Sequence, residues 1–532
     1  MFNYKLFVVG VAVGTLCLTS VMAQADSHYS KIVKTEPETS SSTTTSTTST
    51  SSSPHANLTW QGPGTCLACH TDKAKEVHAS AHYQWQGAAP YMVNGAAQQG
   101  KLKTAMNSYC INIMGNWNGC GACHVGLGAQ PNPTTNPTQT DLQNIDCLIC
   151  HQKDYKRVKV NGVFVPDTAN MTITMDQAVQ TVHKPVRANC IQCHAKGGGG
   201  DNYKRGDMAV AHANTTDKVF DYHMSTSGKN LTCQQCHTTK NHRIAGRGSD
   251  LRETDLDVKV TCTNCHSSKA SLTTGHSSTD ISHHVSRVAC QTCHIPVFAK
   301  NAADTTATEA TEIYRTWVTP EWNATLNRWE PTITKANNVK PVYRFWNGYS
   351  WGYSLYDVAT MNPATGNYPT SYPIGAINDA NSKLYPFKYK TAEAPYDVTR
   401  GTLIALATNV YFSTGKYTDA TLQGLINMGY STADQYRAVK TETWQLITHE
   451  VPPKSYALQC SACHTSSATQ MNLKSMGYVL KADSRTVCSQ CHGYKDPTKI
   501  SYTSLHSKHV ASKKYDCSKC HNFSRPERGL KM

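Results

Sequence analysis

The chain has 532 residues, of which only 39% are apolar, and its formal net charge is +15. Such a low apolar fraction argues against a conventional core, and beyond the N-terminus no stretch approaches the roughly 18 to 20 apolar residues of a transmembrane segment. An excess of positive charge can indicate an anionic partner such as nucleic acid.

The N-terminal segment predicts export. Lys5 precedes an apolar run from Leu6 to Leu18, and Ala23-Gln24-Ala25 offers small residues for cleavage. This arrangement is typical of a secretory signal peptide and is too short for a membrane span. We therefore expect residues 1–25 to be removed and the mature protein to be periplasmic or extracellular.

Residues 26–57 form a segment of unusual composition. Their tract 39–53, TSSSTTTSTTSTSSS, is almost pure Ser and Thr. Such a tract buries too little apolar surface to offset its ordering entropy, so we expect a disordered linker. It is either a tether that holds the protein away from a surface or a tail without a function.

Twenty of the 22 cysteines fall into ten copies of Cys-x-x-Cys-His. In this motif two thiols attach haem c covalently and the histidine ligates the iron. One copy could belong to a zinc site or a redox dithiol, but ten copies that all end in histidine predict ten haems. The cysteines are Cys66, Cys69, Cys120, Cys123, Cys147, Cys150, Cys190, Cys193, Cys233, Cys236, Cys262, Cys265, Cys290, Cys293, Cys460, Cys463, Cys488, Cys491, Cys517 and Cys520. The motif histidines are His70, His124, His151, His194, His237, His266, His294, His464, His492 and His521.

Ten haems change the interpretation of the composition and the charge. The porphyrins supply the missing apolar interior. Each haem brings two propionates, of which a ferric porphyrin offsets about one charge, so ten oxidised haems add roughly −10. The positive side chains therefore mostly neutralise propionates, and we expect no nucleic-acid binding.

The other histidines are candidates for the second axial position of each iron. His28 and His55 lie in the N-terminal tail and are poor candidates, which leaves twelve, including His212 and His283. An iron with imidazole on both sides transfers electrons and binds nothing else, so an enzyme needs one haem that breaks this pattern. The expected second ligands are His78, His82, His183, His223, His242, His276, His284, His449, His506 and His509.

The motif spacing divides the mature chain into four parts. Residues 58–300 hold seven motifs and should form a haem-filled core. Residues 301–459 lack a motif, are rich in Trp and Tyr, and include TADQYRAVKTETWQLITHEV (432–451), which looks helical. Haem eight belongs to residues 460–481, and residues 482–532 form a two-haem extension. The predicted fold class is mostly α-helical and irregular around the haems, with C-terminal helices and little β-structure.

Several segments resemble the octahaem tetrathionate reductase family of multihaem cytochromes. They are YCINIMGNWNGCGACHVGLG (109–128), DCLICH (146–151), CHAKGGGGDNYKRGD (193–207), VACQTCHIPVFAK (288–300) and HEVPPKSYALQCSACH (449–464). The resemblance covers roughly residues 60 to 480, and haems nine and ten have no counterpart in it. It implies that the second haem, held by Cys120 and Cys123, is the active one. It also implies a lysine ligand there, with a free cysteine, an aspartate and a further lysine nearby.

The resemblance assigns these roles to residues of this chain. Cys110 matches the free cysteine, Asp201 in GGGGD matches the aspartate, and Lys240 is the further lysine. The ligand is Lys156, and Lys153 and Lys159 are the alternatives.

The residues alone leave the alternatives open. Cys110 is the only mature cysteine outside a motif, and its thiol is either inert or reactive. GGGGD is either a surface turn or a backbone that passes close to a haem, where a Cβ would clash.

The sequence therefore predicts a secreted multihaem reductase of small inorganic sulfur or nitrogen compounds such as tetrathionate, nitrite or hydroxylamine. Redox partner proteins, either quinol-linked or small cytochrome donors, would supply the electrons. The alternative is a non-catalytic extracellular electron conduit or a filament subunit, and both interpretations allow a homo-oligomer. The deciding feature is whether every iron has histidine on both sides.

Overall fold

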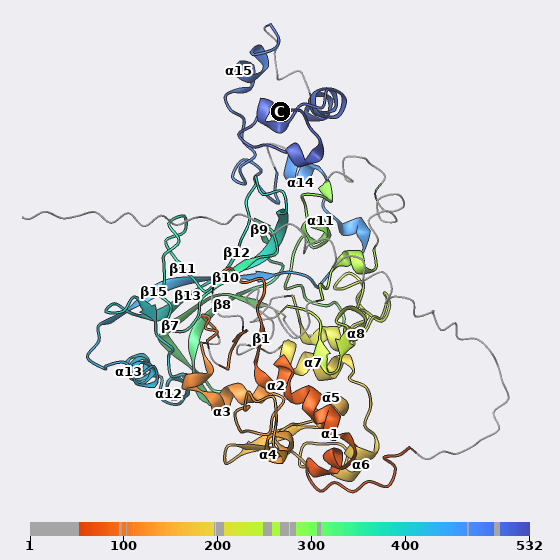
Figure 1. Ribbon diagram of the computed structural model, residues 1–532, viewed down its shortest axis with the longest axis vertical. Coiled ribbons are helices and arrows are strands. Elements are labelled where there is room, and N and C mark those ends of the chain that lie inside the picture. The colour runs from red at the N-terminus through yellow and green to blue at the C-terminus, as the bar shows by residue number, and fades with distance from the viewer. Residues whose placement is uncertain are drawn as a thin grey trace, which may run out of the picture. The chain divides into compact units, whose positions relative to one another are not determined.

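A computed structural model describes residues 53–94, 98–102, 104–109, 111–195, 197, 207–247, 258–266, 276, 284–305, 310–464, 468–493 and 501–532 (Figure 1). They belong to one compact unit, Ser53–Met532. The expected signal peptide, the expected linker up to residue 52, Cys110, Asp201 and His283 lie outside the described residues. Within the described ranges no helix is long and apolar enough to cross a membrane.

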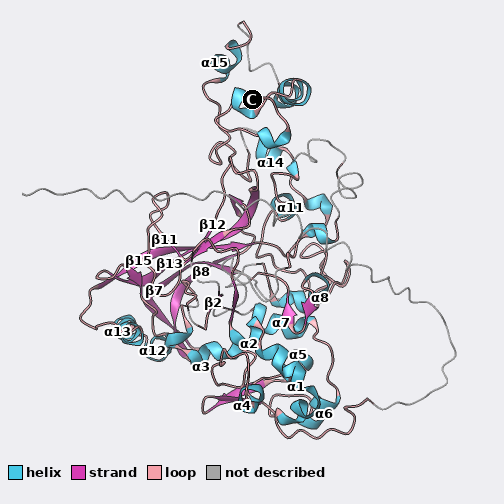
Figure 2. Ribbon diagram, viewed as in Figure 1, coloured by secondary structure: helices cyan, strands magenta, loops and turns pink. Residues whose placement is uncertain are grey.

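Short helices carry the first motifs (Figure 2). A single helical turn suits Cys-x-x-Cys-His because residues three apart lie on the same face. Polar caps begin several neighbouring helices, such as the reciprocal bonds between Thr138 and Asp141 at α4. The helices are α1 (Gly64–His78), α2 (Ala81–Gln84), α3 (Trp117–Cys120), α4 (Gln139–Gln143), α5 (Leu148–His151), α6 (Met175–Gln180), α7 (Arg187–His194), α8 (Cys233–Cys236) and α11 (Cys290–His294). The 3-10 turns are η2 (Ile113–Gly115), η3 (Gly121–Cys123), η4 (Val210–Ala213) and η6 (Cys262–Asn264).

Three two-stranded hairpins lie among these helices. They are β1 (Gln86–Ala88) with β2 (Gln98–Gly100), β3 (Arg157–Val160) with β4 (Val163–Pro166), and β5 (Thr239–Lys240) with β6 (Arg243–Ile244). In β3 the residues alternate between partly buried and exposed, so Arg157 and Lys159 share the inward face.

The aromatic region forms a seven-stranded sheet with the order β11-β15-β13-β7-β8, in which β9 and β14 also pair with β13. Strand β13 runs parallel to β7 and antiparallel to β15. The largest hydrophobic cluster packs here around Trp317, Tyr353 and Tyr411. The strands are β7 (Thr311–Asn323), β8 (Arg328–Ala336), β9 (Val342–Trp346), β11 (Tyr368–Pro369), β13 (Lys383–Asp397), β14 (Thr402–Leu403) and β15 (Tyr436–Leu446), with a separate pair β10 (Ser350–Gly352) and β12 (Ser371–Pro373).

The expected mixture of helical and irregular structure is confirmed, but the helix predicted over 432–451 is wrong. Residues 436–446 form β15, and each of them pairs with a residue of β13. The β-branched residues Val439, Thr441 and Thr443 favour this extended state. The aromatic region therefore holds more β-structure than expected, and its helices are α12 (Thr408–Thr414) and α13 (Tyr417–Asn427).

The last motifs lie on α14 (Ser461–His464), α15 (Ser484–Ser489) and the 3-10 turn η11 (Cys517–Lys519). Between them α16 (Tyr502–His506) continues into η10 (Ser507–Ser512), and η12 (Pro526–Arg528) follows. The final segment returns toward the body of the protein, where the backbone N–H of Ser524 donates to Asn378 and Phe523 packs on Tyr478. In Figure 1 the C-terminus lies between α14 and α15.

Candidate haem sites

Nine motif histidines each face a second imidazole ring. In every pair the ring centroids are 5.7–6.3 Å apart. An imidazole nitrogen lies about 2 Å from the metal that it ligates, so two rings on opposite sides of one iron have centroids roughly 6 Å apart. The spacing therefore fits a haem iron between the rings. With the motif histidine first, the pairs are His70–His55, His151–His242, His194–His82, His237–His449, His266–His223, His294–His276, His464–His284, His492–His509 and His521–His506.

Hydrogen bonds orient several of these rings. Nδ1 of His151 donates to the carbonyl oxygen of His183 at 3.0 Å, and Nδ1 of His237 donates to that of Ala245 at 2.9 Å. A neutral imidazole that is protonated at Nδ1 presents Nε2 to a metal, and the carbonyl oxygen fixes the plane of the ring. Both motif histidines are thus prepared to hold an iron.

The structure places eight of the ten expected second ligands opposite a motif histidine, but not His78 or His183. His78 is buried against the ring of Tyr83, with centroids 5.2 Å apart. Nε2 of His183 accepts a hydrogen bond from the backbone N–H of Lys153, so the nitrogen that would bind iron is occupied. His183 instead contributes through its carbonyl oxygen.

Sequence reasoning missed His55, which faces His70. The predicted linker runs to residue 57 and so includes His55, although the Ser/Thr tract itself ends at residue 53. The signal that could have found His55 is its position shortly before the first motif, outside the low-complexity tract.

His124, the motif histidine of the second site, has different surroundings. The rings of Tyr83, Trp85 and Trp117 lie 5.2–5.3 Å from its ring, and within the described ranges no imidazole faces it. Its Nδ1 accepts from the N–H of Gly126 at 3.1 Å, whereas its Nε2 donates to the backbone oxygen of Tyr83. Ligation of iron through Nε2 would replace the second of these bonds.

Burial determines the charge of His124. It lowers the pKa of this imidazole to about 4, with a smaller contribution from Arg157 in the same direction. The ring is therefore neutral at physiological pH, which is the form that ligates a metal. The motif and the neutral imidazole fit a haem at this site.

An aromatic wall covers His124. Trp85 ends α2 in the left-handed conformation, with φ +51°, and its ring stands edge-on to His124 at an interplanar angle of 80°. A left-handed backbone is costly for a bulky residue and persists only where the surroundings hold it, commonly at functional sites.

Of the three candidate lysine ligands, the structure brings only Lys159 to the second site. Its Nζ donates to the backbone oxygen of Asn118 at 2.7 Å, just before Cys120, and burial lowers its pKa. The Lys156 side chain is exposed, and Lys153 pairs with Asp154 at 2.6 Å.

Lys240 does not lie in this arrangement. It occupies the short strand β5, two residues before His242, and its side chain is exposed. Since His242 faces His151, Lys240 belongs to the surroundings of the third site.

Arg157 connects the second and third sites. Its guanidinium donates to the carbonyl oxygen of His124 at 2.6 Å and to the carboxylate of Asp146 at 2.9 Å. Burial raises the pKa of Asp146, and the charge of Arg157 opposes this shift. This buried ion pair couples the loop of His124 to the start of the CLICH motif.

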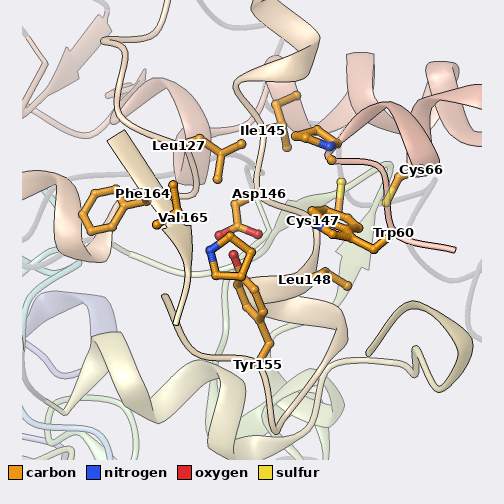
Figure 3. A pocket seen from close by; sticks show the side chains of 13 residues that line it. Trp60, Cys66, Leu127, Ile145, Asp146, Cys147, Leu148, Tyr155, Phe164 and Val165 are labelled. Atoms are coloured by element: carbon orange, nitrogen blue, oxygen red, sulfur yellow. The ribbon is translucent and has the colours of Figure 1, made fainter. Parts of the chain in front are cut away.

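A cavity of about 240 Å³ lies beside this ion pair (Figure 3). Cys66 of the first motif and Cys147 of the third line it together with Trp60, Phe164 and Tyr155. Its largely apolar walls and two motif thiols suit a porphyrin edge.

Sequence reasoning also missed a buried cationic cluster on the sheet. Lys388 and Lys390 are at most 1% exposed, and Lys390 pairs with Glu312 and lies 4.2 Å over the ring of Tyr109. Arg315 donates to the carbonyl oxygen of Tyr109 at 2.9 Å. Burial, with the charge of Lys390, holds the pKa of Lys388 well below its usual value.

This cluster lies against Tyr109, the residue before Cys110. The sequence signal was two lysines in alternate positions of an otherwise apolar and aromatic run, LYPFKYKTAEA (384–394). Buried charges of this kind are rare unless they are paired or functional.

Contacts between motif cysteines show which sites are neighbours. Four pairs of thiols lie within hydrogen-bonding contact. They are Cys66–Cys147, Cys123–Cys193, Cys190–Cys233 and Cys262–Cys290. The fourth motif therefore touches both the second and the fifth, so the spatial order differs from the order in the chain.

Comparison with known proteins agrees with this architecture. Residues 314–467 match the family model described as Cytochrome c bacterial, and residues 65–152 match Cytochrome c554 and c-prime. The crystal structure of octaheme cytochrome c from Shewanella oneidensis has a TM-score of 0.66 and 29% sequence identity, covering 84% of this chain and 98% of that chain. An uncharacterized protein of Archaeoglobus fulgidus is 29% identical over 238 residues, which cover 36% of this chain and 77% of the relative.

Haem c is therefore the group that these motifs hold, and the protein is redox-active. The chain is a multihaem c-type cytochrome, similar over most of its length to the octahaem cytochrome of Shewanella oneidensis.

Proposed function

We propose that the protein binds ten haems c and is a reductase, with nine haems that relay electrons and one, on His124, that reacts with substrate. The observation that carries this proposal is the contrast between nine motif histidines with a facing imidazole and His124 with none in the described ranges. An iron between two imidazoles has no vacant position, so chemistry belongs at the site that departs from the rule.

The residues around His124 suit small anionic or polar substrates. A bound haem would supply electrons and a coordination position, and His124 would hold it from one side. Lys159 would contribute an amine, either as a ligand in its neutral form or as a positive charge beside the substrate, because burial lowers its pKa. Its contact with Asn118 places this amine at the second motif.

Cys110 would be activated by the cationic cluster that contacts Tyr109, the residue before it. The positive charges of Lys390 and Arg315 outnumber the single carboxylate of Glu312, and positive charge near a thiol favours the thiolate. A thiolate can attack a sulfur–sulfur bond, which supports tetrathionate as a substrate. Tetrathionate accepts two electrons and yields two thiosulfates. Nitrite and hydroxylamine are the nitrogen compounds that the resemblance implies.

We further propose that the chain is exported and exchanges electrons with redox partner proteins. The N-terminal signal sequence and the attachment of haem c outside the cytoplasm support this location. A purely conducting role is the competing proposal, and the nine histidine pairs serve it equally well. The two proposals differ only at the second site.

The decisive experiment is electron paramagnetic resonance of the oxidised holoprotein, titrated with nitrite and with hydroxylamine. We expect nine low-spin haems that ignore both compounds and one haem with a different signal that changes. The haem content from a pyridine haemochrome assay provides the control and should be ten per chain. Ten unresponsive low-spin haems would reject the reductase in favour of the conductor.

A further inference from the structure

The C-terminal extension reverses the order of its two haem sites. Tyr478 packs in the same apolar cluster as Cys463 of the eighth motif, and Phe523 lies between Tyr478 and His521 of the tenth motif, with ring centroids 5.1 Å from each. The N–H of Lys481 donates to the carbonyl oxygen of Cys520 of the tenth motif, and α15, which carries Cys488 of the ninth motif, begins three residues after Lys481. The tenth site therefore lies between the eighth and the ninth.

Backbone contacts explain this reversal. The segment of the tenth motif pairs with residues 479–481, where Lys481 N–H donates to the carbonyl oxygen of Cys520 and Asn522 N–H donates to that of Val479, both at 3.0 Å. The chain thus runs past the position of the tenth site, forms the ninth site around α15, and returns. Figure 1 shows α15 beyond the C-terminus as seen from α14.

The ninth site is open to solvent in the described part of the extension. His492 and Cys491 are exposed, whereas His521 and Cys520 of the tenth site are half-buried. An exposed terminal haem is the position from which a chain of haems can exchange electrons with another protein.

Positive charge surrounds this terminal site. The described residues 481–493 and 501–532 contain nine Lys and Arg but only three acidic side chains, a difference of +6. All three acids are engaged. Asp483 caps α15, Asp516 accepts from Ser518, Ser524 and Arg525, and Glu527 lies within 3.9 Å of Arg287.

Exposed lysines flank the ninth site. One of them, Lys508, precedes His509 on η10, and two more, Lys513 and Lys514, follow the end of η10. None of the three makes an ion pair within the described residues. Two oxidised haems would add roughly −2, from four propionates and two ferric porphyrins, so the unit stays positive. A positive face around a haem attracts a negatively charged partner and raises the rate of encounter.

We propose that the residues around the ninth haem form a docking surface for a small acidic electron-transfer protein. The inference rests on the proposed electron relay. In the reductive direction the partner would lose one electron, and a ferric haem held by His492 and His509 would take it up. The electron would then pass to the tenth site and on to the eighth.

The test uses the full-length holoprotein and a reduced acidic flavodoxin as the probe, mixed in a stopped-flow instrument. The variant Lys513→Glu/Lys514→Glu reverses two charges at the surface, and Lys218→Glu/Lys440→Glu makes the same charge change at exposed lysines elsewhere. At low ionic strength we expect the first variant to lower the second-order rate constant at least about tenfold. The control should stay within about twofold of the unmodified protein, and salt should remove the difference.

Equal rate constants for both variants would overturn the docking surface. So would a salt-dependent dimer of the unmodified protein that Lys513→Glu/Lys514→Glu dissociates, because the surface would then bind a second copy. Uptake of electrons from excess dithionite should be the same in all three proteins. The substrate titration of the oxidised protein is independent of these rates, so failure of the reductase proposal is distinguishable from failure of the docking surface.

Discussion

The ring of His124 is surrounded by aromatic residues in place of a second imidazole, and its hydrogen bonds follow from that. The carbonyl oxygen of Tyr83 accepts a hydrogen bond from Nε2 of His124, and the backbone N–H of Gly126 donates to its Nδ1. His124 therefore carries its proton on Nε2, whereas His151 and His237 carry theirs on Nδ1 and donate it to carbonyl oxygens. Iron binding at His124 therefore requires the other tautomer, whereas the paired histidines already have it. The motif histidine thus occurs in two kinds of surroundings, an aromatic one at His124 and one with a facing imidazole at the paired sites.

Lys159→Gln should lower turnover with hydroxylamine or nitrite at least tenfold, a loss of about 1.4 kcal/mol in transition-state stabilisation, with ten haems retained. The reason is that the Lys159 amine lies at the loop of Cys120, where burial favours its neutral form. Lys156→Gln is the matched control, since the Lys156 side chain is exposed. Steady-state kinetics with a viologen dye as the electron donor measure both, and an equal effect of the two changes would contradict the assignment.

At the scale of elements, the sequence predicted the mixture of helical and irregular structure, and its pattern failed at β15. Every residue from Thr441 to Gln445 is buried, so polar residues such as Thr441 and Glu442 lie on buried faces and obscure the alternation that marks a strand. Ladder bonds to β13 decide the conformation there. The partner histidines could be named as a set, but their pairing depends on contacts between distant segments and cannot be read from spacing.

Thr441→Pro should destabilise the protein by about 3 kcal/mol or more, because it removes an N–H from the interior of a sheet. Thr441 pairs with Ala392 of β13 on one side and with Tyr368 of β11 on the other. The control Thr441→Val keeps the backbone N–H and removes only the hydroxyl, whose oxygen lies 2.7 Å from that of Ser108. This change should lower the free energy of unfolding by about 1 kcal/mol. Denaturant unfolding followed by tryptophan fluorescence checks both values, and similar losses would exclude a role for the ladder.

At the scale of the whole molecule, the sites form a network in which the fourth has a central position. Cys193 of its motif touches Cys123 of the second site, and Cys190 touches Cys233 of the fifth. Electrons that arrive from the later motifs would therefore reach the haem on His124 through the fourth haem. The first site lies to one side, in contact with the third through Cys66 and Cys147.

His82→Ala should slow the reduction of the haem on His124 at least about tenfold. The change would remove the second axial ligand of the fourth haem, through which electrons would reach the second site. His55→Ala makes the same change at the first site, away from this route, and should leave that rate unaltered. Each variant should convert one low-spin haem to high spin, since His82 faces His194 and His55 faces His70. Rapid-freeze spectroscopy follows the two haems separately, and equal slowing would place the branch elsewhere.

The pairing of His237 with His449 bears on how the protein matures. If haem is attached while the chain crosses a membrane, the fifth motif would receive it long before His449, which follows β15, becomes available. Until the sheet forms, an iron held by His237 would lack this second imidazole and would be open to oxygen or other small ligands. Closure of the fifth site would then be a late step of maturation, and a chain shortened before residue 449 would carry a reactive haem rather than a protected one.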